Sequence, residues 1–314
     1  MNLKLAVASF LFSLSLGAHA GFDAAKGAYE RGDYAGALKE IRPLAERGDA
    51  GAQLLLGEMY AGGKGVNKDE AEAVKWLRKS AGQGYARAQF SLGLAYIKGA
   101  GVARDEAEGA KWMRKAAEQG LAKAQYNLGV LYVNGRGVPR NEKEAVKWTR
   151  KAANQGVALA QYNLGAAYRD GVGVTRNAKQ ALGWFRKAAG QGDAEAQSEV
   201  GLMYAEGRGA AKDEAAAVKW FRKAAEQGLV GAQFNMGRAY AKGIGVAVDE
   251  AEAVKWFRKA ADQGFGEAQF AMGVASEKGR GMPRNEAEAR EWYRKAADQG
   301  HEGAKIALKA LEHH

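Results

Sequence analysis

The chain has 314 residues, of which 47% are hydrophobic and 26% charged, and its formal net charge is +11. This composition supplies enough apolar material for a packed fold and excludes a disordered chain. No cysteine is present, which excludes disulfides, iron–sulfur clusters, thiol nucleophiles and a lipid-modified N-terminal cysteine. Stability is therefore expected to come from packing alone.

The first twenty residues, 1–20, are predicted to be a cleaved export signal. Lys4 precedes a short apolar run, Leu5 to Leu16, and Ala18 and Ala20 supply the small side chains that a signal peptidase reads. A membrane anchor needs roughly 20 apolar residues, and neither this run nor any later segment provides them. We expect cleavage after Ala20 and a periplasmic or secreted protein that does not span a membrane.

Between residues 52 and 303 the sequence repeats every 36 residues, in seven copies. One glutamine and one tryptophan mark the register of every copy, and the two series are Gln53, Gln89, Gln125, Gln161, Gln197, Gln233 and Gln269, and Trp76, Trp112, Trp148, Trp184, Trp220, Trp256 and Trp292. A period of this length is typical of a solenoid, in which each unit buries its apolar face against its neighbours.

The repeats divide the chain into segments. The predicted copies are 52–87, 88–123, 124–159, 160–195, 196–231, 232–267 and 268–303. Residues 21–51 are expected to form an N-terminal capping helix pair, and residues 304–314 a C-terminal capping helix and tail. The terminal Leu-Glu-His-His is either native or the remnant of an expression tag.

Each copy is predicted to be a pair of antiparallel helices. Two stripes of apolar residues at helical spacing are separated by a loop that carries Gly63 and Gly65 in the first copy. A capping-box pattern begins the second helix, with Asp69 and Glu72, and Gly84 fits a left-handed cap at its end. Gly57 stands in the middle of the first helix, where glycine is unfavourable, so we expect a neighbouring helix to press against it, with the tryptophans filling the space between helices.

The motif A-Q-x-x-L-G-x-x-Y-x-x-G-x-G-V, followed by E-A-x-x-W-x-R-K-A-A-x-Q-G, resembles the Sel1-like repeat (SLR) family, an offshoot of the tetratricopeptide repeats. The resemblance covers nearly all of the chain after residue 20. It implies an all-α fold, a right-handed α-solenoid superhelix whose first helices line a concave groove, and a protein that acts as an interaction scaffold. Ser276 departs from the pattern, because it replaces the tyrosine found in the other copies, and Lys305 stands where the next glutamine would be.

Side chains that could act as catalytic nucleophiles or bases are few after residue 20. Histidine occurs there only at 301, 313 and 314, and no serine has a lysine three residues later to act as base. Clustered zinc ligands are also missing, and the glycine loops follow helices, whereas a dinucleotide-binding loop follows a strand. We therefore predict a non-enzyme with no cofactor and no metal; a cell-wall or β-lactam hydrolase is the weaker alternative.

Positions that vary between copies and face the groove are expected to recognise the partner. The geometry of the family points to the two residues after each glutamine and to those one and four places after the mid-helix glycine. Asparagine can donate to and accept from the backbone of an extended peptide, and neighbouring aromatic rings supply contact area. The candidate contacts, centred on repeats two to four, are Phe90, Tyr126, Asn127, Tyr162, Asn163, Arg169, Phe234, Asn235 and Arg238. The alternative is that the aromatic residues only pack between repeats.

Charge is unevenly distributed, because the basic excess lies in residues 52–195 and the next three copies are neutral. This half could attract an acidic protein segment, anionic lipid headgroups or a phosphate-bearing envelope polymer. The alternative is that the basic K-W-x-R-K motif lies on the solvated outer face as ordinary solubility charge. A second hypothesis is an envelope polyanion or polysaccharide binder that uses the basic outer face. Nucleic acid is not expected, since no aromatic residues are interleaved with the basic ones in a way that suggests base stacking.

Overall fold

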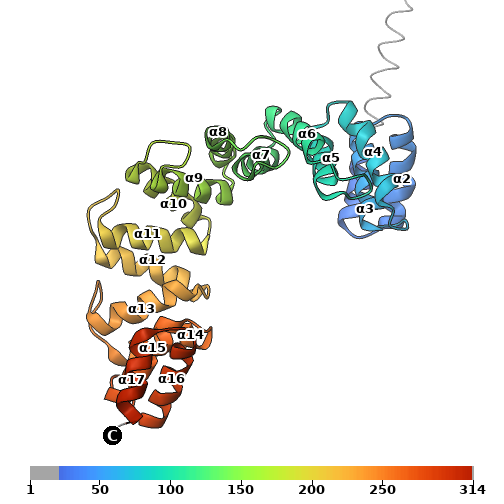
Figure 1. Cartoon of the computed structure of the whole chain (residues 1–314). Helices are drawn as coiled ribbons and strands as arrows, with labels where there is room; N and C mark the ends of the chain where they lie inside the picture. The colour runs from blue at the N-terminus through green and yellow to red at the C-terminus, as the bar shows by residue number, and fades with distance from the viewer. Residues whose placement is uncertain (1–20, 313–314) are drawn as a thin grey trace, which may run out of the picture. The chain divides into compact units, whose positions relative to one another are not determined.

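The computed structural model describes residues 21–312, so the predicted export signal, His313 and His314 lie outside the described part. Every regular element between residues 21 and 312 is a helix (Figure 1). The prediction of an all-α solenoid is thereby confirmed. The chain forms two compact units, residues 1–157 and 158–314, which we describe separately.

The first unit begins with a helix over residues 21–30, and the helices after it come in pairs. Their bounds are α2 (Tyr34–Glu46), α3 (Ala50–Gly62), α4 (Glu70–Gly82), α5 (Ala86–Lys98), α6 (Glu106–Glu118), α7 (Ala122–Asn134) and α8 (Glu142–Asn154). We call the first helix of each repeat the A helix and the second the B helix. Repeats one to three are therefore α3/α4, α5/α6 and α7/α8.

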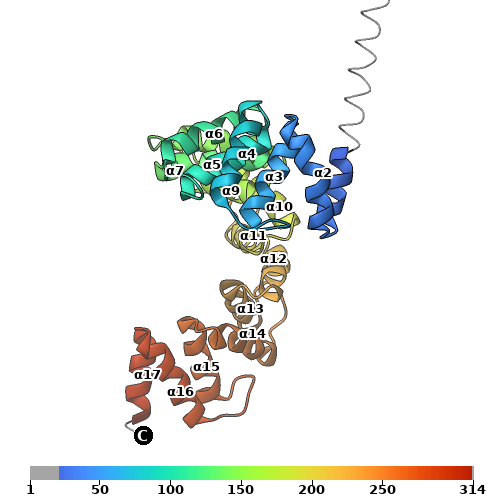
Figure 2. The same cartoon turned by 90° about the vertical axis from the view of Figure 1, so that its right-hand side faces the viewer.

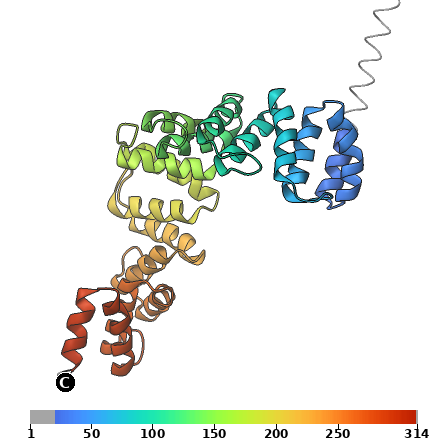
Figure 3. The same ribbon diagram turned by 45° about the vertical axis from the view of Figure 1, so that its right-hand side comes forward.

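The second unit holds repeats four to seven and one further helix. Its helices are α9 (Ala158–Asp170), α10 (Ala178–Gly190), α11 (Ala194–Glu206), α12 (Glu214–Glu226), α13 (Val230–Lys242), α14 (Glu250–Asp262), α15 (Gly266–Lys278), α16 (Glu286–Asp298) and α17 (Glu302–Glu312). Figure 2 shows α11 to α14 following one another as stacked pairs, and in Figure 3 the C-terminal helix α17, in red, lies against the last pair.

The ends of the helices follow from a few residues in each copy. The A helix α3 ends at Gly63, whose φ of +64° is the left-handed conformation that favours glycine. The B helix α4 begins at Asp69, whose side chain accepts a hydrogen bond from the Glu72 amide at 2.9 Å. It ends at Gln83, followed by Gly84 with φ +88°. These caps repeat along the chain and confirm the predicted glycine stops.

The predicted capping box is only half formed. The Asp69 side chain accepts from the Glu72 amide, but the expected return bond from the Glu72 carboxylate to the Asp69 amide is replaced by another contact. The Asp69 amide donates to the Tyr60 carbonyl of the A helix at 2.9 Å, and Glu72 pairs with Lys75 at 2.7 Å. The Glu72 carboxylate is therefore not needed at the cap. Asp213 caps α12 in the same way at 2.8 Å although Ala216 stands in place of the glutamate, because the cap needs only the backbone amide.

The mid-helix glycines allow the A and B helices of a repeat to approach closely, as predicted. A Cβ atom at Gly57 would lie 3.2 Å from the Ala73 carbonyl oxygen of α4, and one at Gly237 would lie 2.5 Å from the Phe257 ring of α14. The two helices of a repeat thus pack closely at the glycine. Glycine lowers helix stability by about 1 kcal/mol relative to alanine, and the packing contact that it allows offsets this loss.

Within each unit, glutamines join a repeat to the helix pair before it. Gln53 is 5% exposed, and its Nε2 donates to the Ala45 carbonyl of the preceding helix at 3.0 Å. Its Oε1 accepts from Gln83 at 2.8 Å, and Gln83 also donates to the Gly48 carbonyl at 2.9 Å. The glutamine pair recurs in every repeat. Both amides are therefore satisfied inside the stack, as burial of a polar group requires.

The tryptophans also belong to the frame. Trp148, Trp256 and Trp292 are buried in the cores between successive repeats, and the other four are partly buried. In every repeat a lysine one turn later lies over the indole ring, for example Lys79 over Trp76 at 3.9 Å. The prediction that the tryptophans fill space between helices is confirmed.

Tyrosines and arginines form a second link between repeats. Arg42, Arg78 and Arg222 donate to the hydroxyl groups of Tyr60, Tyr96 and Tyr240 in the following repeat, at 3.2, 2.9 and 2.6 Å. Where serine replaces the tyrosine, the link changes. Ser276 is buried and donates to the Asn285 carbonyl at 2.7 Å, and Arg258 pairs instead with Glu288 at 3.0 Å.

Candidate partner-binding groove

The second unit contains a hollow of about 340 Å³ between two A helices, α13 and α15, with the B helix α14 as its floor. We call it the repeat-six hollow. Val254 and Phe257 of α14 form the floor, and Phe234, Phe270 and Val274 form the walls. The A helices therefore line a concave surface in this unit, as the family resemblance implies.

The first unit contains a smaller hollow at the same place in its own repeats. The repeat-one hollow, of about 220 Å³, lies between α3, α4 and α5. Val74 and Leu77 of α4 stand at the positions that Val254 and Phe257 occupy in the repeat-six hollow. The repeat architecture thus generates the same concavity in both units.

Small side chains keep these two hollows open. Ala61 and Ser91 line the repeat-one hollow, and Ala241 and Ala271 stand at the equivalent positions of the repeat-six hollow. In each pair, the first residue lies four places after the mid-helix glycine. The second lies two places after the glutamine of the next repeat. No bulky group from the chain itself enters the space at these positions.

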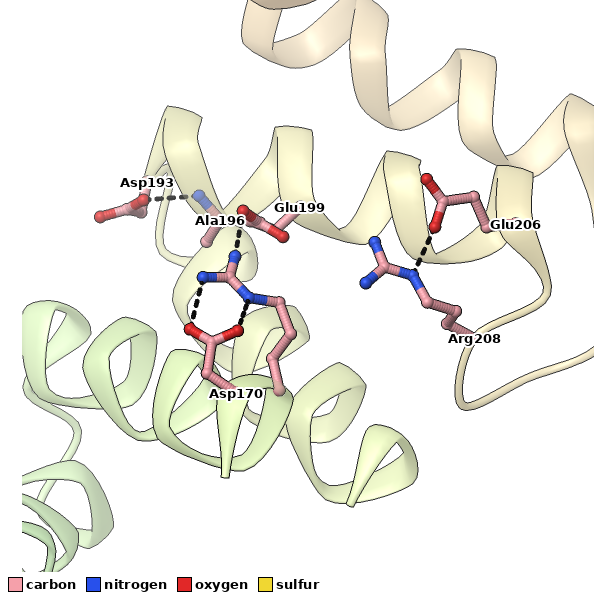
Figure 4. A network of polar contacts seen from close by, with 7 residues as sticks. Asp170, Asp193, Ala196, Glu199, Glu206 and Arg208 are labelled. Carbon is pink, nitrogen blue, oxygen red and sulfur yellow. Dashed lines mark hydrogen bonds and ion pairs between the residues drawn. The ribbon is translucent and has the colours of Figure 1, made fainter. Parts of the chain in front are cut away.

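Larger side chains fill the corresponding space between repeats four and five. Arg169 of α9 stands where Ala241 stands in α13, and its guanidinium pairs with Glu199 of α11 at 2.5 Å. Arg169 also binds Asp170 at 2.8 Å through two nitrogens, and Figure 4 shows Asp170 and Glu199 facing the same guanidinium. These carboxylates raise the pKa of Arg169, with Asp170 as the larger cause, so the cation is committed to the protein itself.

In repeat two an apolar side chain, Ile97, stands at the position of Ala241. Ile97 of α5 packs on α6 where Gly109 replaces the alanine of the other repeats, and a Cβ atom at Gly109 would lie 2.6 Å from Ile97. The concave face is therefore open at some repeats and closed by the chain at others.

The rims of the two open hollows differ in charge. Arg238, Lys242 and Arg280 line the repeat-six hollow together with Glu250 and Glu267. None of the three cations makes an ion pair among residues 21–312, whereas Glu267 is bonded to His301 at 3.2 Å.

The repeat-one hollow carries an acid at the position of Arg238. Glu58 stands there, and Glu70 and Lys98 also line this hollow. The concave wall removes water from the Glu58 carboxylate and so raises its pKa, even though much of the side chain surface is exposed; Arg87 and Lys64 act in the opposite direction. The two hollows would therefore attract different partners.

The sequence-predicted aromatic contacts are partly buried and pack on their own repeats. The Tyr162 ring centroid lies 5.5 Å from that of Phe185, and Phe234 lies 5.7 Å from Phe257 and 5.2 Å from Phe265. Phe90 packs on the core that includes Met113. Burial raises the pKa of Tyr162. Each of these rings thus contributes to packing, and Phe234 also lines the repeat-six hollow.

The predicted polar contacts have more varied surroundings. The Asn127 amide donates to the Lys123 carbonyl of its own helix at 2.8 Å, and Asn235 is partly buried on α13. Tyr126 and Asn127 belong to the first unit, and Asn163 is exposed on α9 in the second. Arg238 is exposed, with its guanidinium 5.9 Å from the Phe234 ring centre. Of the predicted residues, Phe234 and Arg238 line the repeat-six hollow together.

Sequence reasoning missed the residues that create the opening, Ala241 and Ala271, and the floor residues Val254 and Phe257. The signal was present, because both alanines fall in the position series that the family geometry points to. The predicted contacts were the bulky and polar members of those series. The smallest members, however, are the ones beside the open space.

The basic K-W-x-R-K motif of the B helices has structural roles in the described units. Its first lysine pairs with a glutamate one turn earlier in four repeats, as Lys75 does with Glu72. In repeats one, two and five its arginine donates to a tyrosine of the next repeat, and in every repeat its last lysine lies over the tryptophan. Most cations of the motif therefore have contacts within the protein.

Among residues 21–312, no group of three or more His, Cys, Asp or Glu side chains is arranged to hold a metal ion. None of the described helices combines the length and the apolar character needed to cross a bilayer.

A family model of the Sel1 repeat matches seven consecutive stretches, residues 50–85, 86–121, 122–157, 158–193, 194–229, 230–265 and 266–301. The chain belongs to the Sel1 repeat family. The resemblance seen in the sequence is thus confirmed. Sel1 repeat proteins are typically protein–protein interaction scaffolds and are generally non-catalytic.

Two solved structures of Sel1 repeat proteins are similar to this chain. One is c5321, described as a protective antigen of uropathogenic Escherichia coli strains with an SLR fold, at 40% identity and a TM-score of 0.83, covering 87% of this chain and 59% of that one. The other is a Sel1 repeat protein from Oxalobacter formigenes, at 38% identity and a TM-score of 0.69, covering 96% and 90%. This chain thus spans about three fifths of the c5321 structure. The comparison with curated proteins gave no match.

Proposed function

We propose that this Sel1 repeat protein is an exported, non-catalytic scaffold that binds a segment of another protein on the concave face of its A helices, in the cell envelope. Support for export comes from the signal-like sequence of residues 1–20. Mass spectrometry of the natural protein should find Gly21 as the first residue, and a chain that retains residues 2–20 would contradict export.

The two open hollows are the main support for binding on the concave face. The polar groups of the repeat frame bond to one another, whereas the repeat-six hollow leaves apolar walls uncovered beside cations that have no carboxylate partner. Pockets of this kind accept the side chains that contribute most to protein–protein affinity. The polyanion alternative has less support, since most cations of the outer motif have partners within the protein.

Tyr126 and Asn127 in the first unit, and Tyr162 and Asn163 in the second, remain proposed contacts for the backbone of the segment. Within each unit, the asparagine side chain can donate to and accept from the backbone of such a segment, and the neighbouring tyrosine ring can supply contact area. Arg169 is a weaker contact, because Asp170 and Glu199 already occupy its guanidinium.

Closing the hollows should reduce capture of the natural partner. Two double variants, Ala61→Arg with Ser91→Glu and Ala241→Arg with Ala271→Glu, copy the native Arg169–Glu199 pair into the two hollows. Chemical crosslinking in the exported compartment, followed by quantitative mass spectrometry, would measure capture by each variant and by the protein with all four changes.

We expect at least one closure to lower capture about tenfold or more while helical content, measured by circular dichroism, stays unchanged. Full capture by the protein with all four changes would contradict binding at these hollows.

A further inference from the structure

We infer that the repeat-six hollow accepts one large apolar side chain of a partner segment that carries acidic residues next to it. This inference rests on the proposed scaffold function and adds the chemistry of the partner at one site. The partner is therefore an acidic protein segment with an aliphatic or aromatic anchor.

The floor and walls of the hollow determine the anchor. Phe234, Phe257 and Phe270 present ring surfaces, and Val254 and Val274 present methyl groups, around a space of about 340 Å³. This volume lies at the lower end of the range of roughly 300–1,000 Å³ for small-molecule pockets, so one large side chain fills much of it. Burying such a side chain contributes about 1.5–3 kcal/mol in transfer free energy.

The chain itself does not fill the space. Arg169 and Glu199 close the equivalent space between repeats four and five, and Ala241 and Ala271 replace them here. The remaining walls are held in place by packing, since Phe257 lies against Gly237 and Phe270 stacks on His301 with ring centres 4.4 Å apart. A preformed hollow loses little entropy when the anchor enters.

The rim determines the charge of the flanking residues. Arg238, Lys242 and Arg280 come from α13 and from the loop after α15, and none of them is ion-paired in the described chain. In repeat three, by contrast, Arg136 stands at the position of Arg280 and pairs with Glu106 at 2.7 Å. Three cations against Glu250 and Glu267 favour carboxylates on the partner, and they surround the apolar centre as a polar rim.

The repeat-one hollow supplies an internal comparison, because Glu58 lines it at the position of Arg238 and Ala100 lines it at the position of Arg280. In the sequence, Gly62 stands at the position of Lys242. An acidic segment should therefore select the repeat-six hollow although both hollows share one geometry.

A display library of random linear peptides, panned on the full mature protein, tests this inference. Peptides that also bind the closed variant, Ala241→Arg with Ala271→Glu, are removed by counter-selection. Fluorescence anisotropy then compares the affinity of the enriched peptides for the wild type, the closed variant, Arg238→Glu, and the control closure Ala61→Arg with Ser91→Glu.

The expected peptides carry a large apolar residue with aspartate or glutamate beside it. Their affinity should fall about tenfold or more in the closed variant, fall severalfold in Arg238→Glu with a difference that shrinks in high salt, and stay unchanged in the control closure. If the closed variant does not fold, Ala241→Arg alone obstructs the same space and should give the same loss.

Three results would overturn the inference: no peptide enriched over the closed variant, enriched peptides without acidic residues, or equal affinity for the wild type and Arg238→Glu. If the inference fails in this way while closing the repeat-one hollow still abolishes capture of the natural partner, the proposed scaffold function stands. If the inference fails and closing the repeat-one hollow also leaves capture unchanged, the proposed scaffold function is contradicted as well.

Discussion

Single side chains at equivalent positions decide what each repeat of this protein can do. Ala241, Arg169 and Ile97 occupy one position in three repeats: Ala241 lines an open hollow, Arg169 forms an ion pair with the next repeat, and Ile97 packs on the B helix of its own repeat. The mid-helix glycines act in a similar way, because the missing Cβ allows the facing helix to approach. Some positions of the repeat therefore serve packing in every copy, whereas others differ between copies and change the surface.

Two glycine substitutions should have opposite effects. A Cβ at Gly237 would lie 2.5–2.6 Å from the Phe257 ring, so Gly237→Ala should lower stability by about 1–3 kcal/mol through overpacking. Gly183 in α10 has no atom within 4 Å of its would-be Cβ, so Gly183→Ala should raise stability by up to about 1 kcal/mol. Urea unfolding followed by circular dichroism measures both. A gain in stability for Gly237→Ala would contradict the close approach of α13 and α14.

Between elements, the loop of one repeat packs on the start of the B helix of the preceding repeat. A Cβ at Gly101 would lie 1.9 Å from the Glu70 carbonyl oxygen, so only glycine, here with φ +69°, fits this contact. Glu106 at the start of α6 adds an ion pair with Arg136 in the following loop and another with Arg104. These bonds, with Arg136 as the larger cause, lower the pKa of Glu106 to about 2.

The Glu106 pairs should stabilise the protein at neutral pH and not in strong acid. A carboxyl pKa that folding lowers stabilises the native state above the unfolded value of about 4.5, and the stabilisation is lost as the pH falls toward about 2. Glu106→Gln should therefore lower the melting temperature at pH 7, and the difference from the wild type should disappear near pH 2.

The matched control is Glu70→Gln. Glu70 pairs only with Lys68, and Ala100 stands in place of Arg136, so the control should shift the melting temperature less. Equal shifts at pH 7, or a Glu106→Gln difference that persists at pH 2, would argue against a stabilising inter-repeat pair. High salt should reduce the difference as well, since the pair is exposed.

At the scale of the whole molecule, the sequence was sufficient to predict the architecture. The regular glutamines, tryptophans and glycines mark the register of each helix pair because frame contacts such as the Gln53–Gln83 bond recur in every copy, and the Arg78–Tyr96 bond recurs in several. The capping box was the exception, because the Asp69 amide finds the Tyr60 carbonyl of the neighbouring helix, which local sequence spacing does not reveal.

The candidate site was harder to predict, since each hollow depends on three helices at once. The correct position series could be named, and it led to Phe234 and Arg238, but whether a position is open depends on its partner in the next repeat. Arg169 was named from its position four places after the mid-helix glycine, yet Asp170 and Glu199 both pair with its guanidinium. Ala241 and Ala271 carry no chemical signal of their own, and only the packed structure shows the space that they leave.

Site-directed photocrosslinking in the exported compartment tests the central claim most directly. A photoreactive amino acid at Ala271, which lines the repeat-six hollow, is compared with one at Lys219, which is exposed on the B helix α12 and lines neither hollow. The account predicts a discrete crosslinked protein partner at position 271 and none at position 219. A partner captured at 219 but not at 271 would contradict recognition by the concave A-helix face.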